Sequence, residues 1–273
     1  MSEKTRKRAR SPTLLLRRRR RLKRQTTLLR FFERLPCAAR PQPTRAPIVA
    51  ATTGRVVALC DTSRTALAPW AAAGYECCYV ASRSAAEALI GNGERPVFAC
   101  AFPDATDLSI AGARWFKQKR EKNPQFQEEA AAVFEATEAL FRRWGCPYFL
   151  EGPAVGRLRR LWRAPDVVYD PCDFGGWLPP EEEHPAHPDI IPCRDAYRRA
   201  SGLWIGGGYR QPAQRAVEPQ WRYFFSVRTG KRRRMNPVIF ARGADGRAAR
   251  SCPPRGFTRA VYARLTGRTA PLS

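Results

Sequence analysis

The sequence predicts an α/β fold with a largely parallel sheet. Short apolar runs typical of buried strands alternate along the chain with stretches of helical periodicity. Two of these runs end on acidic residues, Asp61 and Glu151, where a parallel sheet presents ligand-binding groups. Hydrophobic residues make up 44% and aromatic residues 11% of the 273 residues, which excludes a wholly disordered chain. No apolar run approaches the ~20 residues that cross a bilayer, which argues against an integral membrane protein.

A basic, disordered arm is predicted for residues 1–54. Residues 1–46 hold 16 Lys and Arg against two acidic residues, a net charge of +14 within the +25 of the whole chain. Arg17–Arg21 is a block of like charge, and four prolines between residues 36 and 47 oppose a continuous helix. The arm could bind DNA, act as a nuclear localisation signal, or be an extension that precedes the true start codon. These three interpretations remain open.

The first part of the folded region, which begins near Arg55, is predicted to contain three strands and one helix. The strands are expected over residues 56–61, 76–80 and 95–102, each of them short and apolar. Residues 65–73 are rich in alanine and are followed by Gly74, which predicts a helix that ends there.

The longest predicted helix covers residues 126–144. Its apolar residues recur at steps of three and four, and Gly145 follows as a stop signal. A further strand over 147–151 ends on Glu151. Because parallel strands end at one edge of a sheet, we expect Asp61, Glu151 and the loop after Phe102 to meet there.

The last hundred residues change in character. Residues 165–220 are rich in proline, glycine and aromatic residues, which predicts a loop-rich insertion folded onto the sheet. Residues 221–273 contain a cluster of basic and aromatic residues over 222–234, followed by a turn and a final helix over 250–265. Aromatic side chains interleaved with cations suit base stacking and phosphate contact.

The nine cysteines are odd in number, and several lie in apolar runs, which indicates reduced thiols in a soluble intracellular protein. Cytoplasm and nucleus remain equally open. The residues Cys172, His184, His187 and Cys193 invite a zinc interpretation, but their spacing matches no familiar structural site, so no metal is expected.

Several segments resemble, in order, motifs of phage-type DNA cytosine-5 methyltransferases, which depend on S-adenosylmethionine. They extend over residues 55–265 and comprise Val57–Asp61 with Pro69-Trp70 and Ala73–Cys77, Phe102–Ser109 with Gly112–Phe116, Cys146–Pro153 with Gly156–Leu158, Pro171–Leu178, Arg194–Tyr197, Leu203-Trp204 and Arg250–Phe257. The resemblance implies a Rossmann-like methyltransferase core, with the cofactor held by Asp61, Thr62, Ser63, Phe102 and Pro103.

In that family a Cys thiolate adds to C6 of a flipped cytosine while an acid binds N3, and C5 then takes the methyl group. The acid falls on Glu151, but the catalytic Pro-Cys pair falls on Asp104 and Ala105. Methyl transfer is therefore expected to be impaired or lost. Cys100 is a weak substitute, because it falls inside a predicted strand.

The cofactor motifs also depart from the family. The turn Asp61–Thr65 lacks the expected glycine, and the ribose-binding acid after the second strand falls near Ala81. S-adenosylmethionine is the implied cofactor only if its binding survives these changes.

The resemblance also implies a partner, double-stranded DNA, with no membrane involved and the protein a monomer. The residues expected to contact DNA are Arg114, Lys117, Lys119, Arg120, Arg157, Arg159, Arg160, Lys231, Arg232 and Arg233. A solvated surface of arginines is the alternative for these positions. Three functions remain open: a methyltransferase homologue with damaged catalysis, a non-catalytic DNA-binding protein on the same scaffold, and an enzyme in which Asp104 or Glu151 does acid–base work on another substrate.

Overall fold

The computed structural model describes residues 54–90, 95–226 and 229–270. The predicted basic arm lies outside these residues up to position 53. The chain divides into two units, and the fold described below belongs to the second, residues 42–273.

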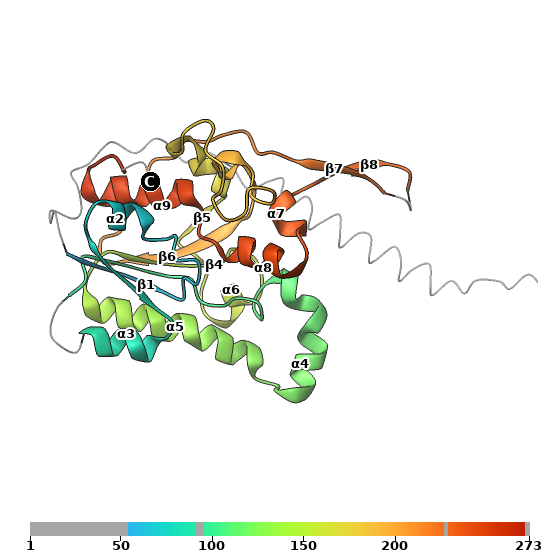
Figure 1. Cartoon of the computed structure of the whole chain (residues 1–273). Helices are drawn as coiled ribbons and strands as arrows, with labels where there is room; N and C mark the ends of the chain where they lie inside the picture. The colour runs from blue at the N-terminus through green and yellow to red at the C-terminus, as the bar shows by residue number, and fades with distance from the viewer. Residues whose placement is uncertain (1–53, 91–94, 227–228, 271–273) are drawn as a thin grey trace, which may run out of the picture. The chain divides into compact units, whose positions relative to one another are not determined.

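A six-stranded sheet forms the centre of this unit (Figure 1). Its order is β2 (Glu76–Val80), β1 (Arg55–Leu59), β3 (Phe98–Ala101), β4 (Tyr148–Pro153), β6 (Ser201–Gly206) and β5 (Val167–Tyr169). The first four strands run parallel, whereas β6 is antiparallel to both of its neighbours. The predicted α/β fold with a mostly parallel sheet is therefore confirmed, and the topology is compatible with a Rossmann-like fold.

Helices cover both faces of the sheet (Figure 1). Helices α2 (Ala68–Ala72) and α9 (Arg255–Thr266) lie on one face, and α3 (Arg83–Ile90) and α5 (Phe126–Trp144) lie on the other. Successive β1 residues alternate between the two apolar clusters, with Val56 in the α9 cluster and Val57 in the α5 cluster. Burial on both faces explains why these strands are continuously apolar in sequence.

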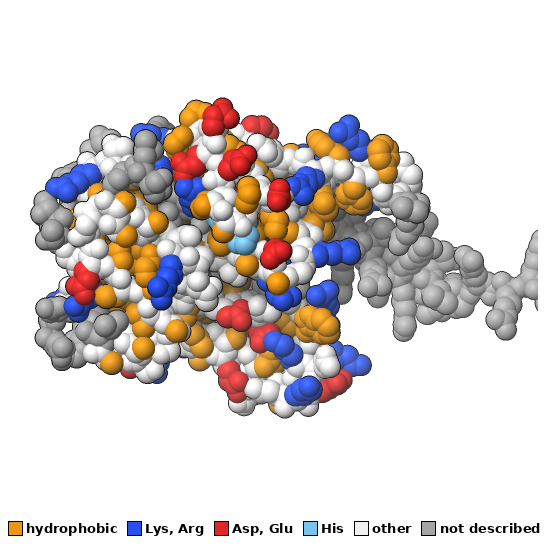
Figure 2. All heavy atoms as spheres, viewed as in Figure 1, with side chains coloured by type: hydrophobic (Ala, Val, Ile, Leu, Met, Phe, Trp, Pro, Cys, Tyr) orange, Lys and Arg blue, Asp and Glu red, His pale blue; other side chains and the backbone are white. Residues whose placement is uncertain are grey.

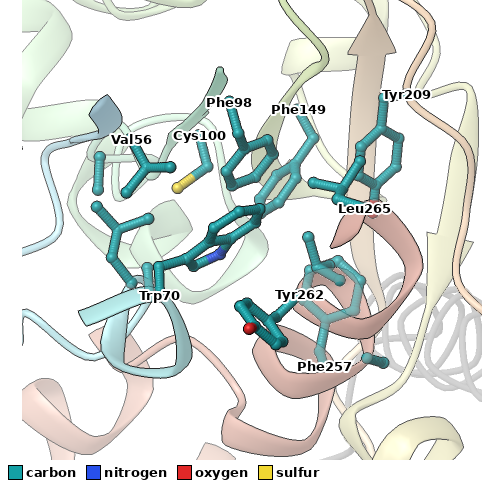
Figure 3. Packing of buried hydrophobic residues seen from close by; sticks show 14 of the residues in the cluster. Val56, Trp70, Phe98, Cys100, Phe149, Tyr209, Phe257, Tyr262 and Leu265 are labelled. Carbon is teal, nitrogen blue, oxygen red and sulfur yellow. The ribbon is translucent and has the colours of Figure 1, made fainter. Parts of the chain in front are cut away.

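The cluster beneath α9 is rich in aromatic rings (Figure 3). Trp70 stacks on Phe98 with ring centroids 5.3 Å apart and meets Tyr262 edge-on at 5.1 Å. Phe149 of β4 packs against Phe257 of α9 at 5.4 Å. These contacts fasten α2 and α9 to β3 and β4, and so they help to position the loops at the ends of these strands.

Shorter elements fill the connections. They are the 3-10 helices η1 (Ile110–Trp115), η2 (Pro171–Trp177) and η3 (Cys193–Asp195), the helices α4 (Phe116–Lys122), α6 (Leu158–Leu161), α7 (Pro237–Phe240) and α8 (Gly243–Ser251), and the hairpin strands β7 (Arg222–Phe225) and β8 (Arg232–Met235). Residues 165–220 were expected to be loop-rich, but they also supply β5 and β6. Glycines at positions 202 and 206 of β6 and the three-residue length of β5 hide both strands in the sequence.

The chain leaves β1 toward β2 and then crosses to β3 on the opposite side of β1. This reversal creates a topological switch point at the carboxyl ends of β1 and β3, where open α/β sheets bind their ligands. Among the described helices, none is both long and apolar enough to cross a membrane.

Candidate functional site

Three loops meet at the switch-point edge of the sheet. They follow β1, β3 and β4, and they carry Asp61, Asp104 and Gly156. The strand expected to end on Glu151 continues to Pro153, so Glu151 lies within β4 and not in the loop after it. The amide of Arg157 donates to the carbonyl of Leu108 at 2.9 Å, which joins the β4 loop to the β3 loop. Gly156 makes this approach possible, because its φ is +133° and a Cβ there would clash with the Leu108 carbonyl oxygen.

The carboxylate of Asp61 organises its own loop. One oxygen accepts from the Ser63 amide at 3.1 Å and the Ser63 hydroxyl at 2.6 Å. The other accepts from the Ala66 amide at 2.8 Å. Asp61 is buried, whereas Thr62 beside it is exposed. Both carboxylate oxygens thus serve the turn that joins β1 to α2.

The loop after β1 turns without the glycine that the family motif requires. Cys60 and Arg64 take up positive φ values of 60° and 56° instead, a conformation that costs about 1–3 kcal/mol for a residue with a Cβ. At the end of β2, the Tyr79 hydroxyl donates to the Arg64 carbonyl at 2.8 Å and closes the loop. Ala81 follows, with no carboxylate. These residues do not fit the ribose of S-adenosylmethionine, because the acid that would hold its hydroxyls is missing.

The loop after β3 presents an alanine where the nucleophile is expected. Phe102 packs edge-on against Phe149 with centroids 5.8 Å apart, and Pro103 is buried. Asp104 is exposed, and one of its oxygens accepts from the Thr106 amide at 2.8 Å and hydroxyl at 2.6 Å. Ala105 is half-buried against the α5 cluster. Its methyl group has no nucleophilic atom to offer.

Neither of the neighbouring cysteines can replace the missing thiolate. Cys100 points into the aromatic cluster beside Val56 and Trp70 and is 1% exposed (Figure 3). Burial, together with the nearby Asp61, raises the pKa of its thiol well above the ordinary value. Burial and the charge of Asp104 also raise the pKa of Cys60. Both side chains are therefore thiols and poor nucleophiles at neutral pH.

Glu151 lies at the centre of a buried polar cluster, which we name the Glu151 cluster: Glu151 of β4, Tyr169 of β5, Arg199, and Ser201 of β6. One carboxylate oxygen accepts from the Arg199 guanidinium at 2.8 Å and the Ser201 hydroxyl at 2.9 Å. The other accepts from the Tyr169 hydroxyl at 2.9 Å. The family acid position thus holds a carboxylate both of whose oxygens accept hydrogen bonds from donors of its own chain.

Arg199 was missed by sequence reasoning, although the matched segment Arg194–Tyr197 ends two residues before it. Burial lowers its pKa, but Tyr197 and Glu151 outweigh that effect and raise it, so the guanidinium stays charged. Arg199 also donates to the carbonyl of Arg250 at the end of α8. Burial and Glu151 raise the pKa of Tyr169 far above its usual value, which keeps its hydroxyl protonated and donating.

The basic residues expected to contact DNA lie on elements that surround this edge. Figure 1 shows α4, α6 and α7 on the side of the sheet where the β3 and β4 loops lie. At the base of the hairpin, Asn236 donates to the carbonyl of Arg198, next to the Glu151 cluster. The exposed basic residues in these elements, in η1 and in the hairpin are Arg114, Lys117, Arg120, Lys122, Arg159, Arg160, Arg222, Lys231, Arg232, Arg233 and Arg234, to which α8 and its preceding residue add Arg242 and Arg247.

Two of the expected DNA contacts are less available. Lys119 pairs with Asp107 at 2.5 Å, and Arg157 is half-buried between the β3 and β4 loops. An open hollow of about 480 Å3 lies beside Lys119, between α4 and α5. Its lining mixes Asp107 and Glu129 with lysines and apolar side chains, so its charges offset one another.

The candidate zinc residues do not come together as a cluster. No group of three or more His, Cys, Asp or Glu is placed to hold a metal ion within the described ranges. Instead, Nδ1 of His184 accepts from the amides of Ala186 and His187 at 3.3 and 3.1 Å. Burial and the charge of Arg255 lower the pKa of His184 to about 4, so it is a neutral acceptor that shapes the loop.

No protein-family model matches this chain, and a search of curated proteins finds no match. The likeness to DNA cytosine-5 methyltransferases therefore rests on the ordered sequence motifs.

Proposed function

We propose that this protein binds double-stranded DNA on a methyltransferase-like scaffold and does not methylate cytosine by the covalent route. One observation carries the proposal: exposed basic side chains surround a sheet edge where the nucleophile position is occupied by Ala105. The DNA-contacting half of a cytosine-5 methyltransferase is thus retained in outline, whereas its reacting half is not.

The charge of this surface supports a polyanion as the partner. None of the exposed cations named above forms an ion pair with a carboxylate in the part of the chain that the structure describes, and six of them lie on α4, α6 and β8 away from the ring stacking of Arg234 and the hollow beside Lys122: Lys117, Arg120, Arg159, Arg160, Arg232 and Arg233. Five of the six are arginines, whose planar guanidinium binds phosphate through two hydrogen bonds. Arginines adjacent in sequence, Arg159 with Arg160 and Arg232 with Arg233, repel one another, and a phosphate backbone relieves that repulsion.

The chemistry of the edge supports the loss of methyl transfer. Without a thiolate at position 105, the covalent adduct at C6 cannot form and C5 is not activated. Both oxygens of Glu151 are already engaged by Arg199, Ser201 and Tyr169 rather than held open for a flipped base, and both oxygens of Asp61 are engaged by its own loop rather than offered to a cofactor.

DNA binding can be tested by fluorescence anisotropy with a labelled duplex. Reversing two charges on α6 in the variant Arg159→Glu/Arg160→Glu is expected to weaken binding by at least about tenfold, since two phosphate contacts become repulsions. Arg210→Glu, compared with the single variant Arg159→Glu, is the matched control. Arg210 is exposed, but it follows β6, whose antiparallel direction carries it to the opposite edge. Equal weakening in both variants, or none in either, would contradict the proposed surface.

The absence of methyl transfer is tested separately. We expect titration calorimetry with S-adenosylmethionine to show no binding heat, and we expect no tritium to pass from labelled cofactor to duplex DNA. Transfer of label to cytosine C5 by the wild-type protein would overturn this part of the proposal.

A further inference from the structure

One face of the β7–β8 hairpin carries an uninterrupted row of aromatic and arginine side chains. Trp221, Tyr223 and Phe225 alternate along the strand and therefore share a face. Arg232 and Arg234 lie on the same face, because they pair with Phe225 and Tyr223. We call these five residues the aromatic–arginine face.

The side chains of this face stack on one another. The guanidinium of Arg232 lies 4.0 Å from the Tyr223 ring centroid, and that of Arg234 lies 4.7 Å from the Trp221 ring. Tyr223 is 55% exposed and Phe225 is 72% exposed. Figure 2 shows hydrophobic and basic side chains gathered where the hairpin extends from the body. Exposed aromatic rings on a two-stranded ribbon mark an interaction surface, since such a ribbon has little stability of its own.

The charge of the hairpin identifies the class of partner. Residues 221–235 contain six Lys and Arg and no acidic residue. An aromatic surface of this charge complements a chain that carries both planar rings and regularly spaced anions, which is a nucleic acid.

The spacing of the rings distinguishes an unpaired strand from a duplex. Alternate residues of an antiparallel strand are about 6.8 Å apart, twice the rise of about 3.4 Å between stacked base pairs. Bases that remain stacked in a duplex cannot each meet a separate ring, whereas the bases of an extended strand can. Guanidinium groups lying over the rings offer further planes for stacking and reach the phosphates between bases.

We propose that the aromatic–arginine face binds unpaired nucleotides of DNA, with bases stacked on Tyr223 and Phe225 and phosphates held by Arg232 and Arg234. The inference rests on the proposed function, since DNA is the partner in both. It adds that the preferred DNA contains a single-stranded stretch.

The test compares a labelled oligothymidine of about 12 nucleotides with a fully paired duplex of equal length, using the full chain. Tyr223→Ala and Phe225→Ala are each expected to weaken oligothymidine binding by roughly 5- to 150-fold, the range for the loss of one stacked base. Duplex binding, which depends on cations of α4, α6 and β8 that both variants keep, is expected to change by less than about threefold. Phe224→Ala is the matched control: Phe224 is 44% exposed on the same strand and points to the opposite face.

The outcomes separate this inference from the proposed function. If the wild-type protein binds duplex but not oligothymidine, the inference fails and the proposed function stands. If it binds neither, both fail. Equal effects of Phe224→Ala and Phe225→Ala on oligothymidine also overturn the inference, since the two faces would then contribute alike. Unfolding midpoints of the variants, measured in urea, are expected to match the wild type because all three side chains are exposed.

Discussion

The ion pair between Glu151 and Arg199 is expected to be the most sensitive polar contact at the switch-point edge. The two side chains are 9% and 18% exposed, and their charged atoms are 2.8 Å apart. The variant Arg199→Met leaves Glu151 with the Tyr169 and Ser201 hydroxyls but with no positive charge. Removing one partner of a buried pair costs about 3–5 kcal/mol, because the other charge stays desolvated. We expect the free energy of unfolding to fall by this amount.

The assay is urea unfolding followed by tryptophan fluorescence at neutral pH. The matched control is Lys119→Met, which breaks a pair whose side chains are 43% and 25% exposed. This change should cost less than about 1 kcal/mol, as surface pairs usually do. The double variant Glu151→Gln/Arg199→Met removes the stranded charge and is expected to be more stable than Arg199→Met alone. A cost for Arg199→Met as small as that of Lys119→Met would refute this reasoning, as would a double variant less stable than the single one.

Three further predictions concern the loops and the core. Gly156→Ala is expected to lower the free energy of unfolding, measured in urea, by about 1–3 kcal/mol, because the added Cβ meets the Leu108 carbonyl oxygen. The control is Gly208→Ala, which is also at positive φ but has open space around it and should cost less. Burial raises the pKa of Asp195 to about 6, so the folded state holds a proton that the unfolded chain has released at that pH. The stability that the protonated Asp195 carboxyl contributes is therefore lost as pH rises from about 4 to about 6. Asp195→Asn should gain stability relative to wild type across that window. A difference in unfolding free energy that stays constant with pH would contradict this. Restoring the nucleophile in Ala105→Cys should give no covalent adduct on DNA containing 5-fluorocytosine, since Glu151 and the cofactor loop remain engaged; a trapped complex in a denaturing gel would show that the base site is intact.

Elements with strong local signals could be predicted from sequence. The helix expected over 126–144 matches α5, since its apolar period is regular and Gly145 adopts the left-handed conformation that ends it. The strand expected over 76–80 matches β2. The placement of Asp61 and Glu151 at one edge also followed from the strand pattern, because parallel strands end together.

The rest of the site depends on contacts distant in sequence. Arg199 meets Glu151 across 48 residues, and no local pattern marks that pairing. The hairpin was also not assigned, because Tyr223, Phe224 and Phe225 are all aromatic and lack the polar alternation that identifies an exposed strand. The hydrogen bonds between the Asp61 carboxylate and its own loop could not be predicted either. An acidic residue after a strand gives the same sequence pattern whether it binds a ligand or a backbone amide.

The salt dependence of duplex affinity tests the central claim most directly. If Lys117, Arg120, Arg159, Arg160, Arg232 and Arg233 each contact a phosphate, these six contacts should contribute a slope of about −5 to the fall of the logarithm of the association constant against the logarithm of salt concentration. The slope should become less steep by about two in a variant with Arg159 and Arg160 replaced by alanine, because two phosphate contacts are removed. A slope near zero for the wild-type protein would contradict DNA binding through this surface.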